Sequence, residues 1–143
     1  MQNLQNMEKA PENRPLDEKL GGIEMSKSKF ESCENNLHYT GVIDIDPKEL
    51  STKLNQVCLV DVRQPEEFTG ELGHIPKAQL IVLDSLTENF AKIPKDKVVV
   101  FVCRSGGRSA RATALALSNG YTEVYNLKGG MLLWNDLHLP TEI

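Results

Sequence analysis

The 143-residue sequence lacks the features that define several protein classes. No stretch approaches the roughly 20 apolar residues of a membrane-spanning helix, so we expect no membrane association. The polar N-terminus contains no apolar segment of the kind found in secretory signals. The net charge is −4, and a protein without an excess of basic residues is not expected to bind nucleic acid.

Cysteine is also scarce. The three cysteines, Cys33, Cys58 and Cys103, lie far apart, and no Cys-x-x-Cys motif occurs. This usage argues against a disulfide-bonded scaffold and against a zinc cluster. It fits a reducing compartment, so we expect a cytoplasmic protein. Cys58 lies in an apolar run and is most simply a small core residue.

The N-terminal quarter of the chain contains few branched apolar residues. Residues 1–38 are rich in Asn, Gln, Lys and Glu, and Pro11 and Pro15 interrupt them. Such a composition cannot bury enough apolar surface to fold alone. We therefore expect a disordered extension over residues 1–38 and a single folded domain over residues 39–143.

Short apolar runs alternate with helix signals throughout that domain. Asp46 can cap a helix that reaches about Leu54, and Gly120 suits the left-handed position after a helix over 108–119. The expected strands are 42–45, 57–62, 78–83, 98–103 and 124–127, with further helices at 65–68, 84–90 and 131–136. This alternation predicts an α/β fold: an open, mostly parallel five-stranded sheet flanked by helices, with right-handed crossovers.

The most apolar run of the chain, Val98–Val102, leads directly into Cys103. A loop with two glycines and two arginines follows, and then an alanine-rich helix. In an open α/β sheet, ligands bind at the carboxyl ends of the strands. Asp61 and Arg63 end another predicted strand, so we expect them at the same sheet edge, where an ion pair between them would brace the loop that follows Cys103.

The loop has the chemistry of an activated thiol. Only about 3% of an unperturbed cysteine is ionised at pH 7, and the thiolate is the nucleophile. Arg104 and Arg108 supply positive charge, and Gly106 and Gly107 allow backbone N–H groups to turn inward. The start of the following helix adds further N–H groups. No histidine lies in the loop, and His38, His74 and His138 are expected to be structural or exposed.

Four blocks resemble a single-domain rhodanese in residue type, order and spacing. They span nearly the whole domain, from Val42 to Pro140. The blocks are Asp61–Phe68, Gly73–Pro76 with Ala78, Cys103–Ser109, and Leu127–Gly130 with Trp134.

The resemblance implies a thiosulfate sulfurtransferase-like enzyme without a metal or organic cofactor. Cys103 would take the outer sulfur of thiosulfate or a similar small anionic donor as a persulfide, and a thiol or cyanide would accept it. A protein acceptor is an alternative recipient. The substrate-binding residues implied by the family are Arg104, Ser105, Gly106, Gly107, Arg108 and Ser109.

Two other functions remain open from the sequence. The first is a non-enzymatic or persulfide-carrying rhodanese module that serves a protein partner. The second is a phosphatase or arsenate reductase of related fold. The six residues from Cys103 to Arg108 match the loop length of rhodaneses, whereas the loop of the related dual-specificity phosphatases is one residue longer. The sequence also departs from the family pattern: Lys77 and His138 stand where glycine is usual, and Val82 where proline is usual.

Overall fold

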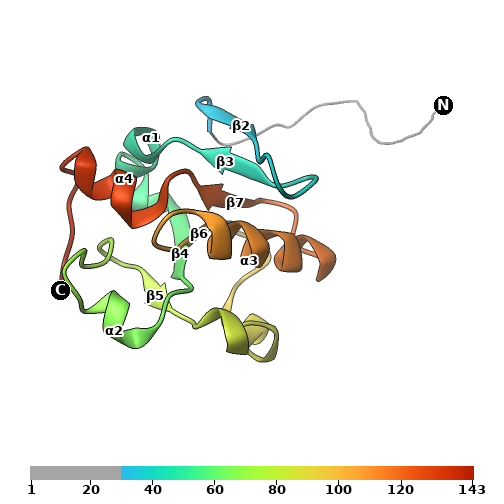
Figure 1. The fold of residues 1–143 in the computed structure, drawn as a ribbon. Coiled ribbons are helices and arrows are strands. Elements are labelled where there is room, and N and C mark those ends of the chain that lie inside the picture. Colours follow the sequence, from blue (N-terminus) through green and yellow to red (C-terminus); the bar gives the residue numbers. More distant parts are fainter. Residues whose placement is uncertain (1–29) are drawn as a thin grey trace. The chain divides into compact units, whose positions relative to one another are not determined.

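The computed structural model describes residues 30–143, and all elements discussed below lie in one compact unit, Ser32–Ile143 (Figure 1). Of the extension expected over residues 1–38, residues 1–29 lie outside the described residues. Within the part that the structure describes, no helix combines the length and the apolar character needed to cross a membrane.

Within residues 30–143, six strands form one sheet in the order β2-β3-β7-β6-β4-β5. All neighbours are parallel except β2, which runs antiparallel to β3. The expected α/β architecture with a mostly parallel sheet is therefore confirmed, and the expected strand count of five is corrected to six. The strands are β2 (Cys33–Asn35), β3 (Ile43–Ile45), β4 (Val57–Asp61), β5 (Gln79–Leu80), β6 (Val98–Val102) and β7 (Val124–Leu127).

The additional strand, β2, lies within the segment that the sequence analysis assigned to the extension. All three of its residues are exposed, so it has no apolar alternation that could predict a strand. Backbone pairing with β3 holds it at the sheet edge, and Asn36 Nδ2 donates a 3.0 Å hydrogen bond to Asp44 on β3. This strand therefore forms because it pairs with β3, and not because of a local sequence pattern.

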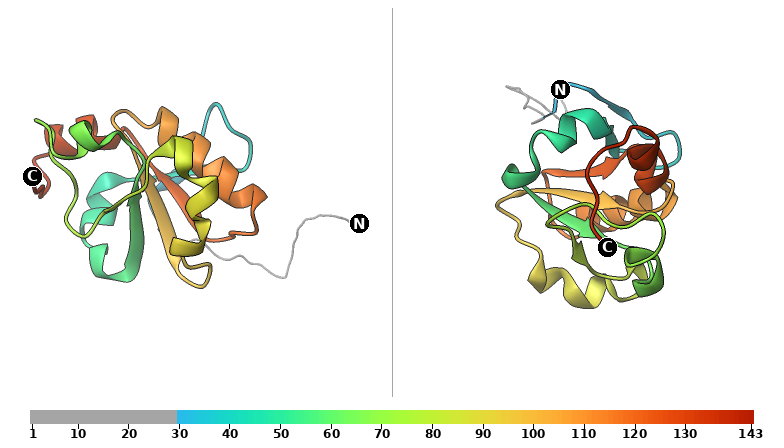
Figure 2. Two further views of the ribbon diagram at one scale, coloured as in Figure 1. Left: turned by 90° about the horizontal axis from the view of Figure 1, so that it is seen from below. Right: turned by 90° about the vertical axis from the view of Figure 1, so that its left-hand side faces the viewer.

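The central strand β6 is covered on both faces. All five of its residues are buried, as expected for a central parallel strand. Val99 and Phe101 face a hydrophobic cluster that includes Ala112 and Ala116 of the long helix α3 (Gly107–Ser118). Helical segments flank the strands on both sides (Figure 2). This packing fixes the end of β6, where the thiol lies.

The remaining helices are short. They are α1 (Pro47–Ser51), α2 (Pro65–Phe68) and α4 (Gly130–Asp136). Asp46 caps α1 as expected, since its carboxylate accepts from the backbone N–H groups of Lys48 and Glu49. However, α1 ends at Ser51 rather than near Leu54.

The helix expected over 84–90 is also wrong, because this region forms two 3₁₀ helices, Leu83–Ser85 and Thr87–Lys92. Polar side chains bond to backbone carbonyls there: Ser85 Oγ donates to Val82 O, and Asn89 Nδ2 donates to Ser85 O. Such local bonds compete with regular α-helix.

Candidate active site

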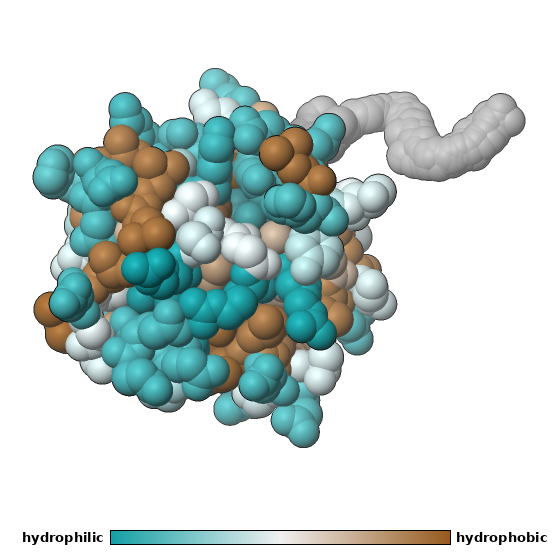
Figure 3. All heavy atoms as spheres, in the orientation of Figure 1, coloured by the Kyte–Doolittle hydropathy of each residue, from teal (hydrophilic) through white to brown (hydrophobic). Residues whose placement is uncertain are grey.

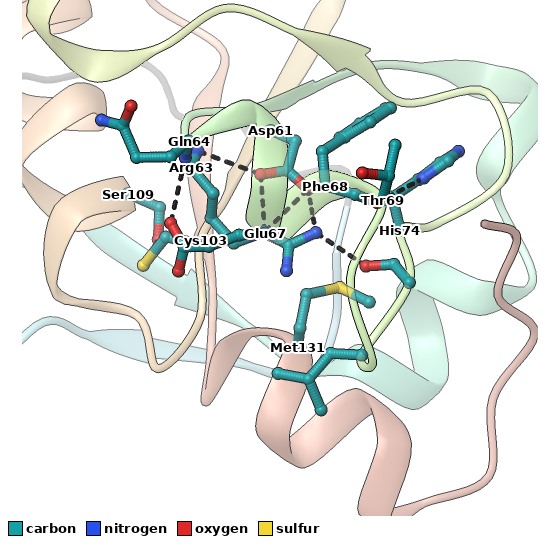
Figure 4. Close-up of polar contacts among 12 residues, drawn as sticks. Asp61, Arg63, Gln64, Glu67, Phe68, Thr69, His74, Cys103, Ser109 and Met131 are labelled. Carbon is teal, nitrogen blue, oxygen red and sulfur yellow. Dashed lines mark hydrogen bonds and ion pairs between the residues drawn. The ribbon is translucent and has the colours of Figure 1, made fainter.

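Cys103 lies directly after β6, at the carboxyl edge of the sheet. Its side chain is 1% exposed. The neighbouring strand β4 ends in register, with Asp61 opposite Val102. The structure therefore brings Cys103, Asp61 and Arg63 to one edge of the sheet, as expected, although they come from different segments (Figure 4).

Two groups of the loop Cys103–Ser109, which we call the catalytic loop after its predicted role, can donate hydrogen bonds to the sulfur. The backbone N–H of Gly106 points at Cys103 Sγ, 3.1 Å away, and Ser109 Oγ lies 3.2 Å from the same sulfur. Gly106 has a φ of +109°, a conformation that favours glycine and that turns its N–H inward. These contacts suit an anionic sulfur, because both groups can donate hydrogen bonds to it.

The first turn of α4 holds the start of the loop. The N–H of Met131 donates to Cys103 O over 2.9 Å, and the N–H of Leu132 donates to Arg104 O over 3.0 Å. Gly130 has a φ of +57°, and a Cβ added there would lie 2.4 Å from Cys103 O. The absence of a side chain at Gly130 therefore lets these two backbone segments approach closely.

A chain of polar side chains runs from the thiol across the sheet. Ser109 Oγ lies 2.5 Å from Asn126 Oδ1 on β7, and Asn126 Nδ2 donates to Asp44 Oδ1 over 2.9 Å. Because a carboxylate only accepts, Asp44 orients the Asn126 amide with its oxygen toward Ser109. Neither Asn126 nor Asp44 is among the predicted site residues. The signal in the sequence is Asn126, a polar side chain within an otherwise apolar, buried strand.

Arg108 forms an ion pair with a residue outside the predicted site. Its guanidinium donates two hydrogen bonds, of 2.8 and 2.9 Å, to the carboxylate of Glu67 on α2. The hydrogen bond from Arg108 holds the pKa of Glu67 at about 2, and the same contact raises the pKa of Arg108. The Arg108 guanidinium is therefore largely neutralised by Glu67, and this ion pair joins α2 to α3 at the site.

The other loop arginine is more open. Arg104 is exposed and lines a hollow of about 250 Å³ together with Arg63 and three glutamates, Glu66, Glu67 and Glu71; we call it the acidic hollow. Ser105 and Gly107 are exposed parts of the loop surface. The loop thus offers Arg104 to solvent on a side where carboxylates outnumber arginines.

The expected pair of Asp61 and Arg63 is present and buried. Arg63 Nε lies 2.9 Å from Asp61 Oδ1, and an Arg63 terminal nitrogen lies 2.8 Å from Asp61 Oδ2. The same nitrogen donates to Gly73 O over 2.7 Å. The pair is present, but the expectation that it braces the catalytic loop is corrected: its hydrogen bonds reach Gly73, in the loop that carries His74, and no atom of the catalytic loop.

His74 makes structural contacts, and the two cysteines other than Cys103 lie in different environments. His74 stacks on Phe68 with 3.8 Å between ring centroids, and its Nδ1 donates to Phe68 O. Burial raises the pKa of the Cys58 thiol, and Cys33 is exposed on β2. Among residues 30–143, no three His, Cys, Asp or Glu side chains gather closely enough to hold a metal ion.

Comparison with known proteins gives consistent results. The family model of the rhodanese-like domain matches residues 46–137. A protein named sulfurtransferase from Allochromatium vinosum is 40% identical over 102 residues, which cover 69% of this chain and 94% of that protein. The thiosulfate sulfurtransferase GlpE of Vibrio cholerae is 29% identical over 100 residues, covering 70% of this chain and 92% of its own.

The structural comparison agrees. The crystal structure of a rhodanese-like domain protein from Staphylococcus aureus superposes with a TM-score of 0.60 at 35% identity, covering 70% of this chain and 98% of that one. The family model spans the loop Cys103–Ser109 and the strands β4, β5, β6 and β7. This chain belongs to the rhodanese-like domain family.

Proposed function

We propose that this protein is a sulfurtransferase that carries a sulfane sulfur as a persulfide on Cys103. The observation that supports this most directly is the placement of the Cys103 sulfur, which receives the Gly106 N–H and lies against the Ser109 hydroxyl. Both contacts come from the six residues that follow the thiol. Family membership and relatives named sulfurtransferases support the same reaction class.

The donor in this proposal is thiosulfate or a similar small anion. The Cys103 thiolate attacks the outer sulfur, a new sulfur–sulfur bond forms, and sulfite leaves with the electron pair of the broken bond. A thiol or cyanide then attacks the outer sulfur of the persulfide, and the Cys103 thiolate leaves. These two displacements give ping-pong kinetics. Arg104, exposed beside the thiol, is the loop cation available to the incoming anion.

The test is a thiosulfate-to-cyanide assay on the full chain, with mass spectrometry after incubation with thiosulfate alone. Wild type is expected to form thiocyanate and to gain the mass of one sulfur atom. Cys103→Ser is expected to do neither, whereas the matched thiol control Cys58→Ser retains both. Wild type that gains no sulfur and forms no thiocyanate would refute the proposal. Sulfur gain without turnover to small acceptors would instead favour a persulfide carrier for a protein partner.

A further inference from the structure

The Ser109 hydroxyl lies between two acceptors and has a single proton to donate. Its Oγ is 2.5 Å from Asn126 Oδ1 and 3.2 Å from Cys103 Sγ. An amide oxygen accepts hydrogen bonds readily, whereas a divalent sulfur is a weak acceptor. The shorter distance and the better acceptor both assign the Ser109 proton to Asn126. The hydroxyl then turns an oxygen lone pair, rather than a proton, toward the Cys103 sulfur.

Asp44 determines which atom of the Asn126 amide faces Ser109. Its Oδ1 accepts hydrogen bonds from two side-chain amides, from Asn126 Nδ2 over 2.9 Å and from Asn36 Nδ2 over 3.0 Å. Because the NH₂ group of Asn126 is directed at this carboxylate, the amide oxygen points the other way, toward Ser109. Without Asp44, the amide could turn over and donate to Ser109 Oγ, which would release the serine proton for the sulfur.

This chain of hydrogen bonds is internal. Ser109, Asn126 and Cys103 are 0%, 2% and 1% exposed, so bulk water does not compete for the serine proton. The outer face that carries α3 shows small hydrophobic areas between hydrophilic ones and gives no sign of the polar chain beneath it (Figure 3). Among residues 30–143, the two acceptors within reach of the hydroxyl are therefore Asn126 Oδ1 and Cys103 Sγ.

The two states of Cys103 in the proposed reaction respond differently to a withheld proton. In the thiolate the negative charge is on Sγ, and a hydrogen-bond donor stabilises it. In the persulfide anion the charge is centred on the outer sulfur, about 2 Å beyond Sγ, and Sγ itself is a neutral divalent atom. Withholding the Ser109 proton therefore raises the free energy of the thiolate more than that of the persulfide.

We propose that Asp44 is a positioning residue that acts through Asn126 and Ser109 to shift the loading equilibrium of Cys103 toward the persulfide. This inference rests on the proposed function. In the loading step the Cys103 thiolate attacks the outer sulfur of thiosulfate. The bond from Sγ to that sulfur forms, and sulfite leaves with the electron pair of the broken bond. In the reverse step sulfite attacks the same outer sulfur, and Cys103 leaves as thiolate.

The experiment measures this equilibrium in mixtures of thiosulfate and sulfite. Intact mass spectrometry gives the loaded fraction of the full chain in a Cys33→Ser/Cys58→Ser background, at a pH where Cys103 alkylation has reached its maximal rate in every variant. Asp44→Leu removes the acceptor of the Asn126 amide. It is expected to need a roughly tenfold higher ratio of thiosulfate to sulfite for half loading than the parent chain, the effect of one hydrogen bond to a charged group. An unchanged ratio would overturn the inference.

Asp44→Asn separates positioning from charge. Both amides donate to the same oxygen of Asp44, and an asparagine retains an oxygen at that place. Asp44→Asn is therefore expected to restore the parent ratio. A shift as large as that of Asp44→Leu would assign the effect to the lost negative charge and would overturn the positioning role.

Asn36→Ala is the control for disturbance of the β2–β3 hairpin. It removes the other amide that donates to Asp44 and leaves the hydrogen bond from Asn126 in place. It is expected to keep the parent ratio. A tenfold shift in Asn36→Ala would trace the effect to the hairpin rather than to the Asn126 amide, and the inference would then be wrong.

Two further variants place the effect on the Ser109 proton. Asn126→Ala removes the competing oxygen itself and should shift the ratio as Asp44→Leu does, so the inference stays testable if Asp44→Leu does not fold. In a Ser109→Ala background, Asp44→Leu should cause no additional shift, because the two residues act through one hydroxyl. A shift that persists without this hydroxyl would overturn the inference.

A second readout separates this inference from the proposed function. The pH dependence of Cys103 alkylation by iodoacetamide needs no sulfur transfer, and its midpoint should lie about one pH unit lower in Asp44→Leu than in the parent chain. A midpoint that does not move would overturn the positioning role. A midpoint that moves in a protein that takes up no sulfur from thiosulfate would refute the proposed function and support the positioning of Ser109 by Asp44.

Discussion

The guanidinium of Arg108 and the carboxylate of Glu67 form a two-point ion pair across 41 residues of sequence, with nitrogen–oxygen distances of 2.8 and 2.9 Å. The pair ties the first turn of α3 to α2 and so fixes the end of the catalytic loop. An arginine that would otherwise be free to bind substrate is thereby given a fixed orientation. Arg108 is therefore not the free cation that the loop sequence alone suggests.

The Glu67–Arg108 pair makes stability depend on acid pH. The pKa of Glu67 falls from 4.5 to about 2 in the folded protein. Because the folded value lies below the unfolded one, the contribution is fully present above pH 4.5 and is lost as the pH falls through 2. In Glu67→Gln, we expect the unfolding free energy to fall less between these pH values than in wild type. Urea unfolding at a series of pH values measures this, and identical pH profiles would contradict it.

The Ser109 hydroxyl has one proton and two acceptors within reach. Asp44 orients Asn126 so that its oxygen competes with the Cys103 sulfur for that proton. In Asn126→Ala the proton is free to stabilise the thiolate, so we expect alkylation of Cys103 at pH 7 to quicken about 2- to 10-fold. Iodoacetamide kinetics in a Cys33→Ser/Cys58→Ser background measures this. The effect should vanish in Ser109→Ala, and its persistence there would disprove the role of Ser109.

Gly130 permits the close contact between α4 and the loop. In Gly130→Ala the new methyl group would meet the carbonyl oxygens of Cys103 and Arg104 at 2.4 and 2.5 Å. We expect a loss of at least roughly 2 kcal/mol of unfolding free energy, together with a loss of sulfur transfer. Gly107→Ala is the control, because a Cβ there meets nothing within 4 Å. Comparable losses in the two variants would refute the close-contact argument.

Lys77 and His138 have φ values of 75° and 57°, in the left-handed region that favours glycine. These are the two positions where the sequence departs from a usual glycine of the family. A non-glycine residue in this conformation lowers the free energy of unfolding by about 1–2 kcal/mol. That loss is at least as large as the entropic cost of placing a glycine there. Lys77→Gly should therefore keep or raise the melting temperature. Ala114→Gly within α3 should lose about 1 kcal/mol. A similar loss in Lys77→Gly would contradict this explanation.

The buried Asp61–Arg63 pair is expected to be sensitive to removal of one partner. Their side chains are 0% and 1% exposed, so either charge left alone would be unpaired in the interior. Arg63→Met should lower the unfolding free energy by about 3–5 kcal/mol. The double variant Asp61→Leu/Arg63→Met, which removes both charges, should recover a large part of the loss. Chemical denaturation measures both, and equal losses in the two variants would argue against an uncompensated charge.

The sequence predicts much of this fold because its signals are local. Val124–Leu127 was expected as a strand and is β7, since a short β-branched and aromatic run has few alternatives. The helix predicted over 84–90 was wrong because hydrogen bonds from side chains to nearby carbonyl groups outweigh helix propensity there. The strand β2 was not predicted because its residues have no apolar pattern of their own and form a strand only by pairing with β3.

The geometry of the catalytic loop follows from local sequence signals. The loop contains a thiol after an apolar strand, two glycines and the start of a helix, all within seven residues. Local backbone geometry therefore brings Gly106 and Ser109 to the sulfur. The distant residues that complete the site depend on strand order and helix packing. Strand order places Asn126 beside Asp44, across 82 residues, and α2 beside α3, so that Glu67 meets Arg108. Such pairs depend on crossovers and packing, and no local pattern in the chain encodes them.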